Sequence, residues 1–397
     1  MDNFWEHEGW EQADPHLSKV RAMPFQRRFP FVPEKPGLYI VRGPRQIGKS
    51  SWLKTILSYH ASRVPCFYLS CENIPDHLDL AEILKSVRDR KVVLLDEVNF
   101  VKDWDRAVKH EVDSGKTSML VLTGSHAYDL TRGADRMPGR FGSGGEFELL
   151  PMGFDEFLAM REQAGWRGGE RVEALRTYFR VGGFPTAVAE AGAGARRPRK
   201  AMATYLRWLT GDAAALGKQE TYLKELLIQL AQTLQTPISL QTLAKKTRIG
   251  SHNTVQDYVA LLEACFAVRT LYAVDLDSGA YRFKKEKKFY FTDPLLFWIA
   301  LDLSGMAAPD NVEDRLAEMV AHEALSRRFG RFGYLRTKAG EIDFVCPKRW
   351  AVEVKWSAVP RDLSPAYKRL PLLDKTVWTH ANFLTEFPHA SPDRDLE

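Results

Sequence analysis

A phosphate-binding pattern lies near the N-terminus of the chain. Residues 43–50, Gly-Pro-Arg-Gln-Ile-Gly-Lys-Ser, match G-x-x-x-x-G-K-[ST] in full. The glycines allow a tight turn whose backbone N–H groups face phosphate oxygens, and the helix that follows adds partial positive charge. We expect Lys49 to reach the β- and γ-phosphates of a nucleoside triphosphate, and the Ser50 hydroxyl to ligate Mg²⁺. The predicted nucleotide-binding residues are Gly43, Pro44, Arg45, Gln46, Ile47, Gly48, Lys49, Ser50 and Ser51.

Two adjacent carboxylates follow an apolar run downstream of this loop. The run Lys91–Asp96 ends in an aspartate and is followed directly by Glu97. This is a Walker B pattern, in which Asp96 would hold the magnesium ion and Glu97 would orient and polarise the attacking water. An apolar strand ending in Asp-Glu is common, but together with the upstream loop it predicts triphosphate hydrolysis.

Further polar groups follow the next apolar run. Ser125, in Leu-Thr-Gly-Ser-His, is predicted to sense the γ-phosphate or the attacking water, and a capped strand end is the alternative interpretation. Arg140, in Gly-Arg-Phe, is a candidate for stabilising transition-state charge in cis or in trans. Arg132 and Arg136 are its rivals nearby.

A second group of charged residues lies near the C-terminus. Strand alternation places Glu353 and Lys355 on one face of a strand, and Asp343 closes a preceding strand nearby. Two carboxylates and a lysine that converge in this way would bind Mg²⁺ and activate water against a phosphodiester. The spacing is loose, so a solvated hairpin remains the alternative.

The elements that must position the first set of residues form an α/β pattern. Short apolar runs alternate with helical patterns in the first half of the chain, which predicts a parallel sheet covered by helices. The candidate strands are Gly37–Arg42, Cys66–Cys71, Lys91–Asp96, Ser118–Thr123 and Glu146–Leu150. Each of the first four ends just before a residue type that could do chemistry, at the position where ligands bind in open α/β sheets.

The second half of the chain predicts a different architecture. Beyond a helical pattern at Met152–Met160 and a small, basic linker at Ala191–Lys200, three short helices precede two strands, as in a winged helix-turn-helix. The helices are Tyr222–Leu234, Ser239–Lys246 and Ser251–Cys265, with Ser239 and Ser251 as N-caps, and the strands are Ala267–Asp275 and Lys288–Thr292. A helix at Asn311–Phe329 and strands at Glu341–Cys346 and Trp350–Lys355 make the last segment α/β again.

Composition sets the broad class. The 397 residues are 45% hydrophobic and 27% charged, close to the average for soluble globular proteins, and suggest two or three domains. The first residues lack the pattern of a secretory signal, and no run of about 18 apolar residues occurs, so we expect a cytoplasmic protein. The four cysteines fit no standard zinc pattern and are expected to be reduced core thiols. The net charge of +5, with basic clusters at Arg196–Lys200 and Lys284–Lys288, favours polyanionic partners weakly, and solvated loop charge is the preferred interpretation of each cluster.

The order of these motifs resembles a family of bacterial and archaeal AAA-type ATPases that carry a restriction-endonuclease-like C-terminal domain. The resemblance covers nearly the whole chain and rests on the segments GPRQIGKS, VVLLDE, LTGS, LLPMGFDEF, GGFP, TVQDYVALLE, FYFTDP, EIDFV and AVEVKWS. It implies an additional-strand P-loop NTPase domain with sheet order 5-1-4-3-2, a helical region with a winged helix, and an α/β PD-(D/E)XK-like domain. In that class a helical acid often joins the metal ligands. Glu318 matches that position best, beside Asp343 and Glu353, and Glu323 is its rival.

The motifs and the family resemblance together predict the cofactors, the domains and the function of the chain. We expect ATP and Mg²⁺ as cofactors and four segments, namely an ATPase domain (1–160), a helical lid or linker (161–220), a winged helix (221–292) and a nuclease-like domain (293–397).

The leading hypothesis is an ATPase that couples its nucleotide state to nucleic-acid binding or processing. The alternative is an assembly or signalling switch whose C-terminal domain binds DNA or protein without cleavage. DNA and a second copy of the chain are candidate partners, and no membrane partner is expected. Acidic Asp257 and Glu263 on the presumed recognition helix argue against strong major-groove binding.

Overall fold

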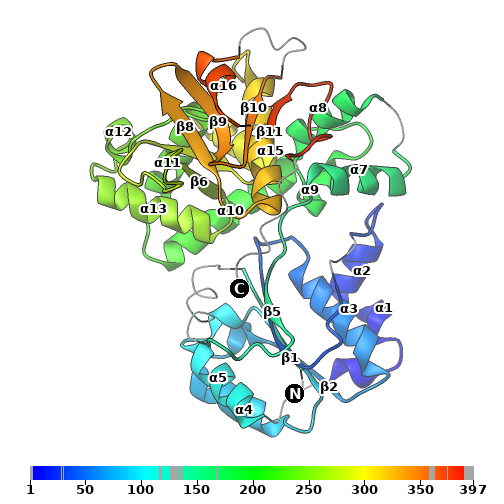
Figure 1. The fold of residues 1–397 in the computed structure, drawn as a ribbon. Coiled ribbons are helices and arrows are strands. Elements are labelled where there is room, and N and C mark those ends of the chain that lie inside the picture. Colours follow the sequence, from blue (N-terminus) through cyan, green and yellow to red (C-terminus); the bar gives the residue numbers. More distant parts are fainter. Residues whose placement is uncertain are drawn as a thin grey trace. The chain divides into compact units, whose positions relative to one another are not determined.

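The chain forms two compact units. The computed structural model describes residues 3–27, 29, 31–115, 119–125, 133, 137–166, 169–356, 363–372 and 374–388. Unit 1 comprises Met1–Met152, Ala159–Trp166 and Ala264–Phe266, and unit 2 comprises Gly153–Leu158, Arg167–Glu263 and Ala267–Glu397. In Figure 1 the sheet of unit 1 is coloured blue to green and that of the C-terminal part of unit 2 orange to red.

Unit 1 is built on a parallel five-stranded sheet in the order β2-β3-β4-β1-β5, the predicted order. The strands are β1 (Gly37–Arg42), β2 (Cys66–Ser70), β3 (Val92–Asp96), β4 (Met119–Gly124) and β5 (Gly145–Glu148). Strands β3 and β4 are buried along their whole length, as expected for near-continuous apolar runs in a sheet covered on both faces. Each predicted strand is present: β1 has the predicted ends, and each of the other four is shifted by one or two residues at one or both ends.

Helices cover both faces of this sheet. Helix α3 (Lys49–Ala61) lies on one face, and α4 (His77–Ser86) and α5 (Trp104–Ser114) pack together on the other (Figure 1). Right-handed crossovers require this, because the chain moves from β1 outward to β2 and then returns through β3 to β4. Asp76 caps α4 by accepting the Leu78 N–H at 2.8 Å. Before β1 lie η1 (Phe4–Glu6), α1 (Trp10–Ala13) and α2 (Pro15–Arg21), and short 3-10 turns η2 (Cys71–Asn73) and η3 (Val98–Phe100) follow β2 and β3.

The first part of unit 2 is helical and ends in a β-hairpin. Its elements are α8 (Arg171–Val181), α9 (Pro185–Ala191), α10 (Arg199–Ala215), α11 (Glu220–Gln232), α12 (Leu240–Lys246), α13 (His252–Ala264), β6 (Val268–Tyr272) and β7 (Lys287–Phe291), and α7 (Phe154–Gln163) is divided between the units. Three helices and an antiparallel hairpin appear in the order expected of a winged helix. Ser239 caps α12 by accepting the Thr242 N–H at 3.0 Å, as predicted.

Helix α14 (Pro294–Ser304), which the sequence patterns did not reveal, is central to unit 2. It contacts α8, α10 and α11, and its apolar side chains from Leu295 to Leu301 are all buried. A helix that is apolar on every side has no period to detect, because all its faces are covered. Asp293 caps it by accepting the Leu295 N–H at 2.8 Å and also accepts the Gly183 N–H at 2.7 Å. The GGFP and FTDP segments therefore meet in space.

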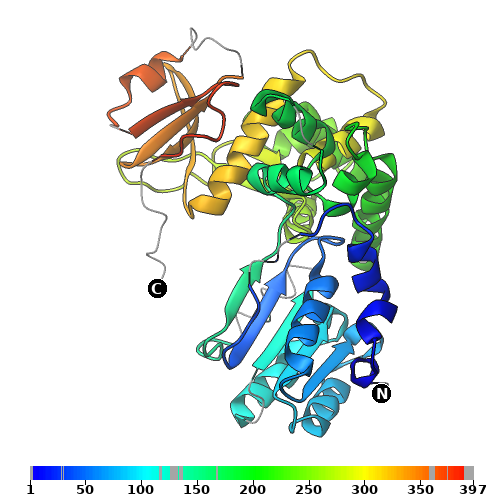
Figure 2. The same cartoon turned by 90° about the vertical axis from the view of Figure 1, so that its right-hand side faces the viewer.

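The C-terminal part of unit 2 is a four-stranded mixed sheet in the order β11-β10-β9-β8. Its elements are α15 (Val312–Arg328), β8 (Gly333–Thr337), β9 (Gly340–Cys346), β10 (Trp350–Val354), α16 (Pro365–Arg369) and β11 (Asp374–Trp378). Helix α15 contacts both β7 and β10. Figure 2 shows this yellow-orange helix beside the orange-to-red sheet. The sheet is tied to the hairpin, since Val274 donates its N–H to the Tyr334 carbonyl at 3.0 Å.

Two sequence expectations concern the chain as a whole. Cys66, Cys71, Cys265 and Cys346 are all buried free thiols, as predicted. Within the described ranges, no helix is both long and apolar enough to cross a membrane.

Candidate functional site

The predicted phosphate loop lies between the end of β1 and the start of α3. Gly48 has φ +103°, a conformation that side chains rarely adopt, and it precedes the first residue of the helix. Gly43 is required for a different reason, because a Cβ there would lie 2.1 Å from the Leu149 carbonyl oxygen. Arg27 supports the loop by donating to the carbonyl oxygens of Ile47 at 3.3 Å and Leu150 at 2.7 Å. No sequence pattern marked Arg27 for this role.

The Lys49 ammonium lies over the loop that precedes it. Its side chain is buried, and Nζ donates to the carbonyl oxygens of Gly43 at 2.9 Å and Pro44 at 3.0 Å. It is also 3.9 Å from Oε1 of Glu97. Lys49 and Glu97 are 48 residues apart in sequence, and this contact brings the predicted phosphate loop close to the predicted Walker B glutamate. The hydroxyl-bearing Ser50 and Ser51 follow it in the first turn of α3.

Asp96 is held by side chains from the strands on each side. Its Oδ1 accepts the Thr123 hydroxyl at 2.6 Å from β4, and its Oδ2 accepts the Tyr68 hydroxyl at 2.9 Å from β2. Thr123 also accepts the Glu97 N–H at 3.2 Å. Tyr68 has no local sequence signal, since only the strand order places it beside Asp96. Burial, together with the neighbouring Asp96 charge, raises the pKa of Tyr68 and keeps it a hydrogen-bond donor.

Glu97 has a constrained backbone, and its carboxylate accepts hydrogen bonds from Ser125. Its φ is +52°, an unusual value for a residue with a side chain. Its Oε2 accepts both the hydroxyl of Ser125 at 2.9 Å and the N–H of the same residue at 3.1 Å. Ser125 was predicted to act on the γ-phosphate or on water, and in this structure its partner is the residue expected to orient that water.

Arg140 contacts an acidic side chain of α5. Its Nε lies 2.6 Å from Oδ1 of Asp113, and its second terminal nitrogen lies 3.2 Å from Oδ2 of the same carboxylate. Its rivals Arg132 and Arg136 lie outside the described residues, as does His126.

The C-terminal acids come together on neighbouring elements of unit 2. Asp343 lies in the middle of β9 and does not close the strand as expected, since the strand runs to Cys346. Its Oδ2 accepts the Val354 N–H at 2.9 Å, and its own N–H lies 3.3 Å from Oε2 of Glu353 on β10. Lys355 pairs with Glu353 at 3.0 Å, so the predicted proximity of these three residues is present.

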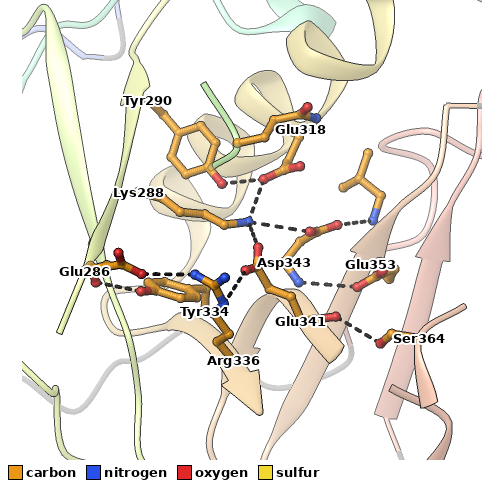
Figure 3. Close-up of polar contacts among 12 residues, drawn as sticks. Glu286, Lys288, Tyr290, Glu318, Tyr334, Arg336, Glu341, Asp343, Glu353 and Ser364 are labelled. Atoms are coloured by element: carbon orange, nitrogen blue, oxygen red, sulfur yellow. Dashed lines mark hydrogen bonds and ion pairs between the residues drawn. The ribbon is translucent and has the colours of Figure 1, made fainter. Parts of the chain in front are cut away.

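A buried lysine that the sequence analysis did not single out lies among these acids. Nζ of Lys288 is 3.0 Å from Glu318, 2.7 Å from Glu341 and 3.7 Å from Asp343 (Figure 3). Lys284 and Lys285 of the same basic cluster are exposed, as solvated charge should be, but that interpretation is wrong for Lys288. The alternation of β7 turns Lys288 and Tyr290 to one side, and the Tyr290 hydroxyl donates to Glu318 at 2.5 Å.

Of the two helical acids considered, Glu318 is the one that faces this group. Glu323 instead pairs with Arg269 at 3.0 Å and Arg327 at 3.1 Å. Burial and the Asp343 charge raise the pKa of Glu318 to about 7, and the same two causes raise the pKa of Glu353 to about 7. In the part of the chain that the structure describes, no group of three or more His, Cys, Asp or Glu side chains is arranged to hold a metal ion.

Comparison with family models identifies two consecutive domains. Residues 35–158 match a model described as an AAA domain, and residues 172–307 match a model described as a domain of unknown function, DUF8612. The first match covers the phosphate loop, Asp96 and Glu97. The chain therefore contains an AAA-type P-loop domain followed by a domain whose function is not assigned.

The individual proteins and solved structures that resemble this chain have low sequence identity to it. An uncharacterized protein of Haemophilus influenzae is 27% identical over 337 residues, covering 78% of this chain and 79% of that protein. An uncharacterized protein of Methanocaldococcus jannaschii is 26% identical over 168 residues, covering 39% of this chain and 36% of that protein. Among solved structures, the ORC2 protein of Aeropyrum pernix aligns with 13% identity and a TM-score of 0.36 over 74% of this chain and 92% of that chain. The RuvB motor of Thermotoga maritima aligns with 15% identity and a TM-score of 0.32 over 59% and 81%.

Proposed function

We propose that the AAA-type domain binds ATP with Mg²⁺ and hydrolyses it. The observation that carries this proposal is the meeting of three strand ends at one edge of the sheet. The phosphate loop follows β1. Asp96 is the last residue of β3, and Glu97 follows it. Ser125 follows β4, which lies between β1 and β3. The 3.9 Å approach of Lys49 to Glu97 spans this edge.

The side chains at this edge fit a magnesium-bound triphosphate. The ammonium of Lys49 is hydrogen-bonded to loop carbonyls, so its charge is held at the loop where phosphate oxygens would be bound. Ser50 and Asp96 offer the hard oxygen ligands that Mg²⁺ prefers, and the metal would supply charge neutralisation at the phosphates. Glu97 would accept a proton from water, or orient that water, from a position held by Ser125.

Replacement of Lys49 and Glu97 separates binding from hydrolysis. We expect Lys49→Ala to lose triphosphate turnover and to bind ATP weakly, and Glu97→Gln to bind ATP but release phosphate at least about a hundredfold more slowly. Phosphate release and binding of a fluorescent ATP analogue measure the two effects. Undiminished phosphate release from Lys49→Ala would refute the proposal.

Ser125 is proposed to position Glu97. Ser125→Ala removes the 2.9 Å hydrogen bond from the hydroxyl but keeps the one from the backbone N–H. We expect kcat to fall by about tenfold, with the affinity for ATP unchanged, because one hydrogen bond to a charged group is worth about 1.5 kcal/mol. Ser125→Thr should restore most of the rate. A change confined to KM would show that Ser125 contacts the nucleotide instead.

Arg140 is proposed to act on a neighbouring copy of the chain. Within its own unit it is paired with Asp113, so a role in transition-state stabilisation requires that pair to open. Mixing Arg140→Ala with Glu97→Gln tests this role, because two inactive variants would restore activity at shared sites if the arginine is supplied in trans. A mixture as slow as its components would show that Arg140 does not act in trans.

We propose that ATP turnover controls DNA or protein binding by unit 2. Two roles are available for residues 293–397, nucleic-acid cleavage and binding without cleavage. The contacts of Lys288 favour binding, because the carboxylates that a nuclease would use for its metal are already paired with an ammonium group.

One experiment distinguishes these roles. Phosphate release is measured with and without duplex DNA for the wild-type chain and Glu97→Gln, and the DNA is then run on a gel. Binding without cleavage predicts DNA-dependent turnover, intact DNA and an affinity that falls steeply with salt. Nicking that requires a divalent metal and is lost in the double variant Asp343→Ala with Glu353→Ala would establish cleavage instead.

A further inference from the structure

The Lys288 side chain reaches the C-terminal acids from another part of unit 2. It starts on β7, in the hairpin that precedes α14, whereas Glu318 lies on α15 and Asp343 on β9. Only 1% of the lysine side chain is exposed, so its charge is compensated by protein groups and not by water. Figure 3 shows Nζ between the carboxylates of Glu318, Glu341 and Asp343.

Each carboxylate in this group already has donors from the chain itself. Glu318 accepts the Tyr290 hydroxyl in addition to pairing with Lys288. Asp343 accepts a backbone N–H from β10 at 2.9 Å, and Glu353 pairs with Lys355 at 3.0 Å. The oxygens are therefore turned toward N–H and O–H groups, in contrast to the inward-facing oxygen shell that Mg²⁺ requires at about 2.0–2.1 Å.

The position of the ammonium is what excludes a metal. Nζ lies within 3.7 Å of both Glu318 and Asp343, so a cation shared by these two carboxylates would have to occupy the same space or lie in contact with a like charge. Burial by itself lowers the pKa of Lys288, but the charges of Glu318, Asp343 and Glu341 outweigh burial and hold that pKa well above its ordinary value. Carboxylate oxygens 2.7 Å and 3.0 Å from Nζ surround the amine with groups that favour its charged form.

We propose that Lys288 is the built-in cation of this acidic cluster, and that the cluster binds no divalent metal ion while Nζ lies among its carboxylates. The ion pairs of this ammonium group with the acids of α15 and β9 hold these two elements together. This is the structural role that a bound metal ion would otherwise have. Because an ammonium group does not lower the pKa of a bound water as a metal does, the cluster organises the fold and does not activate water. This inference concerns unit 2 and does not depend on ATP hydrolysis in unit 1.

Mn²⁺ binding to the full-length, nucleotide-free chain tests the proposal. Free Mn²⁺ is measured by electron paramagnetic resonance in titrations of the wild type, Lys288→Met and Asp343→Asn. The wild type and Asp343→Asn should bind Mn²⁺ equally weakly. Lys288→Met, which keeps most of the length of the side chain but removes its charge, should gain a site at least about tenfold tighter that disappears when Asp343→Asn is added.

Two further variants make the test specific. Lys284→Met removes the same charge from an exposed position in the same hairpin and should leave Mn²⁺ binding at the wild-type level. Because Lys288→Met alone leaves buried carboxylates unpaired and is expected to destabilise the fold, Lys288→Met combined with Glu341→Gln removes one charge of each sign and is titrated in parallel. That variant should also gain an Asp343-dependent site.

Each result of the Mn²⁺ titrations either supports or overturns the proposal. Mn²⁺ binding by the wild-type chain that Asp343→Asn abolishes would overturn the proposal, because it would mean that the metal displaces Lys288. Failure of both lysine variants to gain a site would also overturn it, because something other than Lys288 would then keep the metal out. Gain of a site in both variants but not in Lys284→Met supports it.

Discussion

Asp293 offers a quantitative test of how unit 2 accommodates a buried acid. Its side chain is fully buried where the GGFP and FTDP segments meet, and it accepts N–H groups from Gly183 at 2.7 Å and Leu295 at 2.8 Å. Burial raises the pKa of Asp293 from 3.8 to about 7, although the two hydrogen bonds act in the opposite direction. Asp293→Asn keeps the shape and an oxygen acceptor while removing the titrating group.

The sign of the effect follows from the raised pKa. Below about pH 4 the folded and unfolded chains both carry the proton, so Asp293 contributes no pH dependence there. As the pH rises to about 7 the unfolded chain releases the proton freely and the folded chain does not, so the wild type loses stability across this window and levels off above it. At about 1.4 kcal/mol for each pH unit between 3.8 and 7, the loss amounts to roughly 4 kcal/mol.

Urea unfolding of the wild type and Asp293→Asn between pH 4.5 and 8 measures this loss. The free energy of unfolding of the variant, relative to the wild type, should rise with pH by a few kcal/mol and become constant above about pH 7.5. Asp302→Asn, on the same helix but with a half-exposed side chain paired with Arg197, is the matched control for the change from carboxylate to amide. Parallel curves for Asp293→Asn would refute a raised pKa at this carboxyl.

Two other substitutions test packing and charge. Gly182→Ala should destabilise unit 2 by at least about 2 kcal/mol, because the backbone there has φ +79° and a Cβ would lie 2.1 Å from Oδ1 of Asp293, whereas Gly194→Ala, with open space around it, should change the unfolding midpoint little. Equal midpoints for the two alanine variants would contradict the clash. Lys54→Met should cost about 3–5 kcal/mol because it leaves the buried carboxylate of Asp14 without its partner. Adding Asp14→Asn should recover most of that loss in the same urea assay, and an additive double variant would rule out the coupling.

The parts of the nucleotide site that could be predicted from the sequence are those formed by residues close together in the chain. The loop at 43–50 is contiguous, and its backbone geometry follows from its glycines, so the motif, strand β1 and helix α3 could all be located from the sequence. Asp96 and Glu97 follow from an apolar run of the right length. Tyr68 could not be found in this way, because its contact with Asp96 depends on which strands are neighbours.

The C-terminal cluster shows the same limit more strongly. Asp343, Glu353 and Lys355 lie within 13 residues of one another, and strand alternation was enough to bring them together. Lys288 is 55 residues before Asp343, in a run where Lys284, Lys285 and Lys287 have the same charge. Only the fold determines which member of that run is buried. Sequence patterns therefore identified the acids but not the ammonium that changes their chemistry.

The Lys288 side chain connects the hairpin to the C-terminal sheet of unit 2, and this limits where this part of the gene can be divided. A fragment that begins at residue 293, where the sequence patterns place a domain border, would encode Glu318, Glu341 and Asp343 without the lysine that compensates them. Such a fragment would have to bury carboxylates with no cation or expose the interior of its sheet to water. A recombination event or a truncated expression clone that separates the hairpin from the sheet is thus expected to yield insoluble protein, so the two segments should be inherited and cloned together.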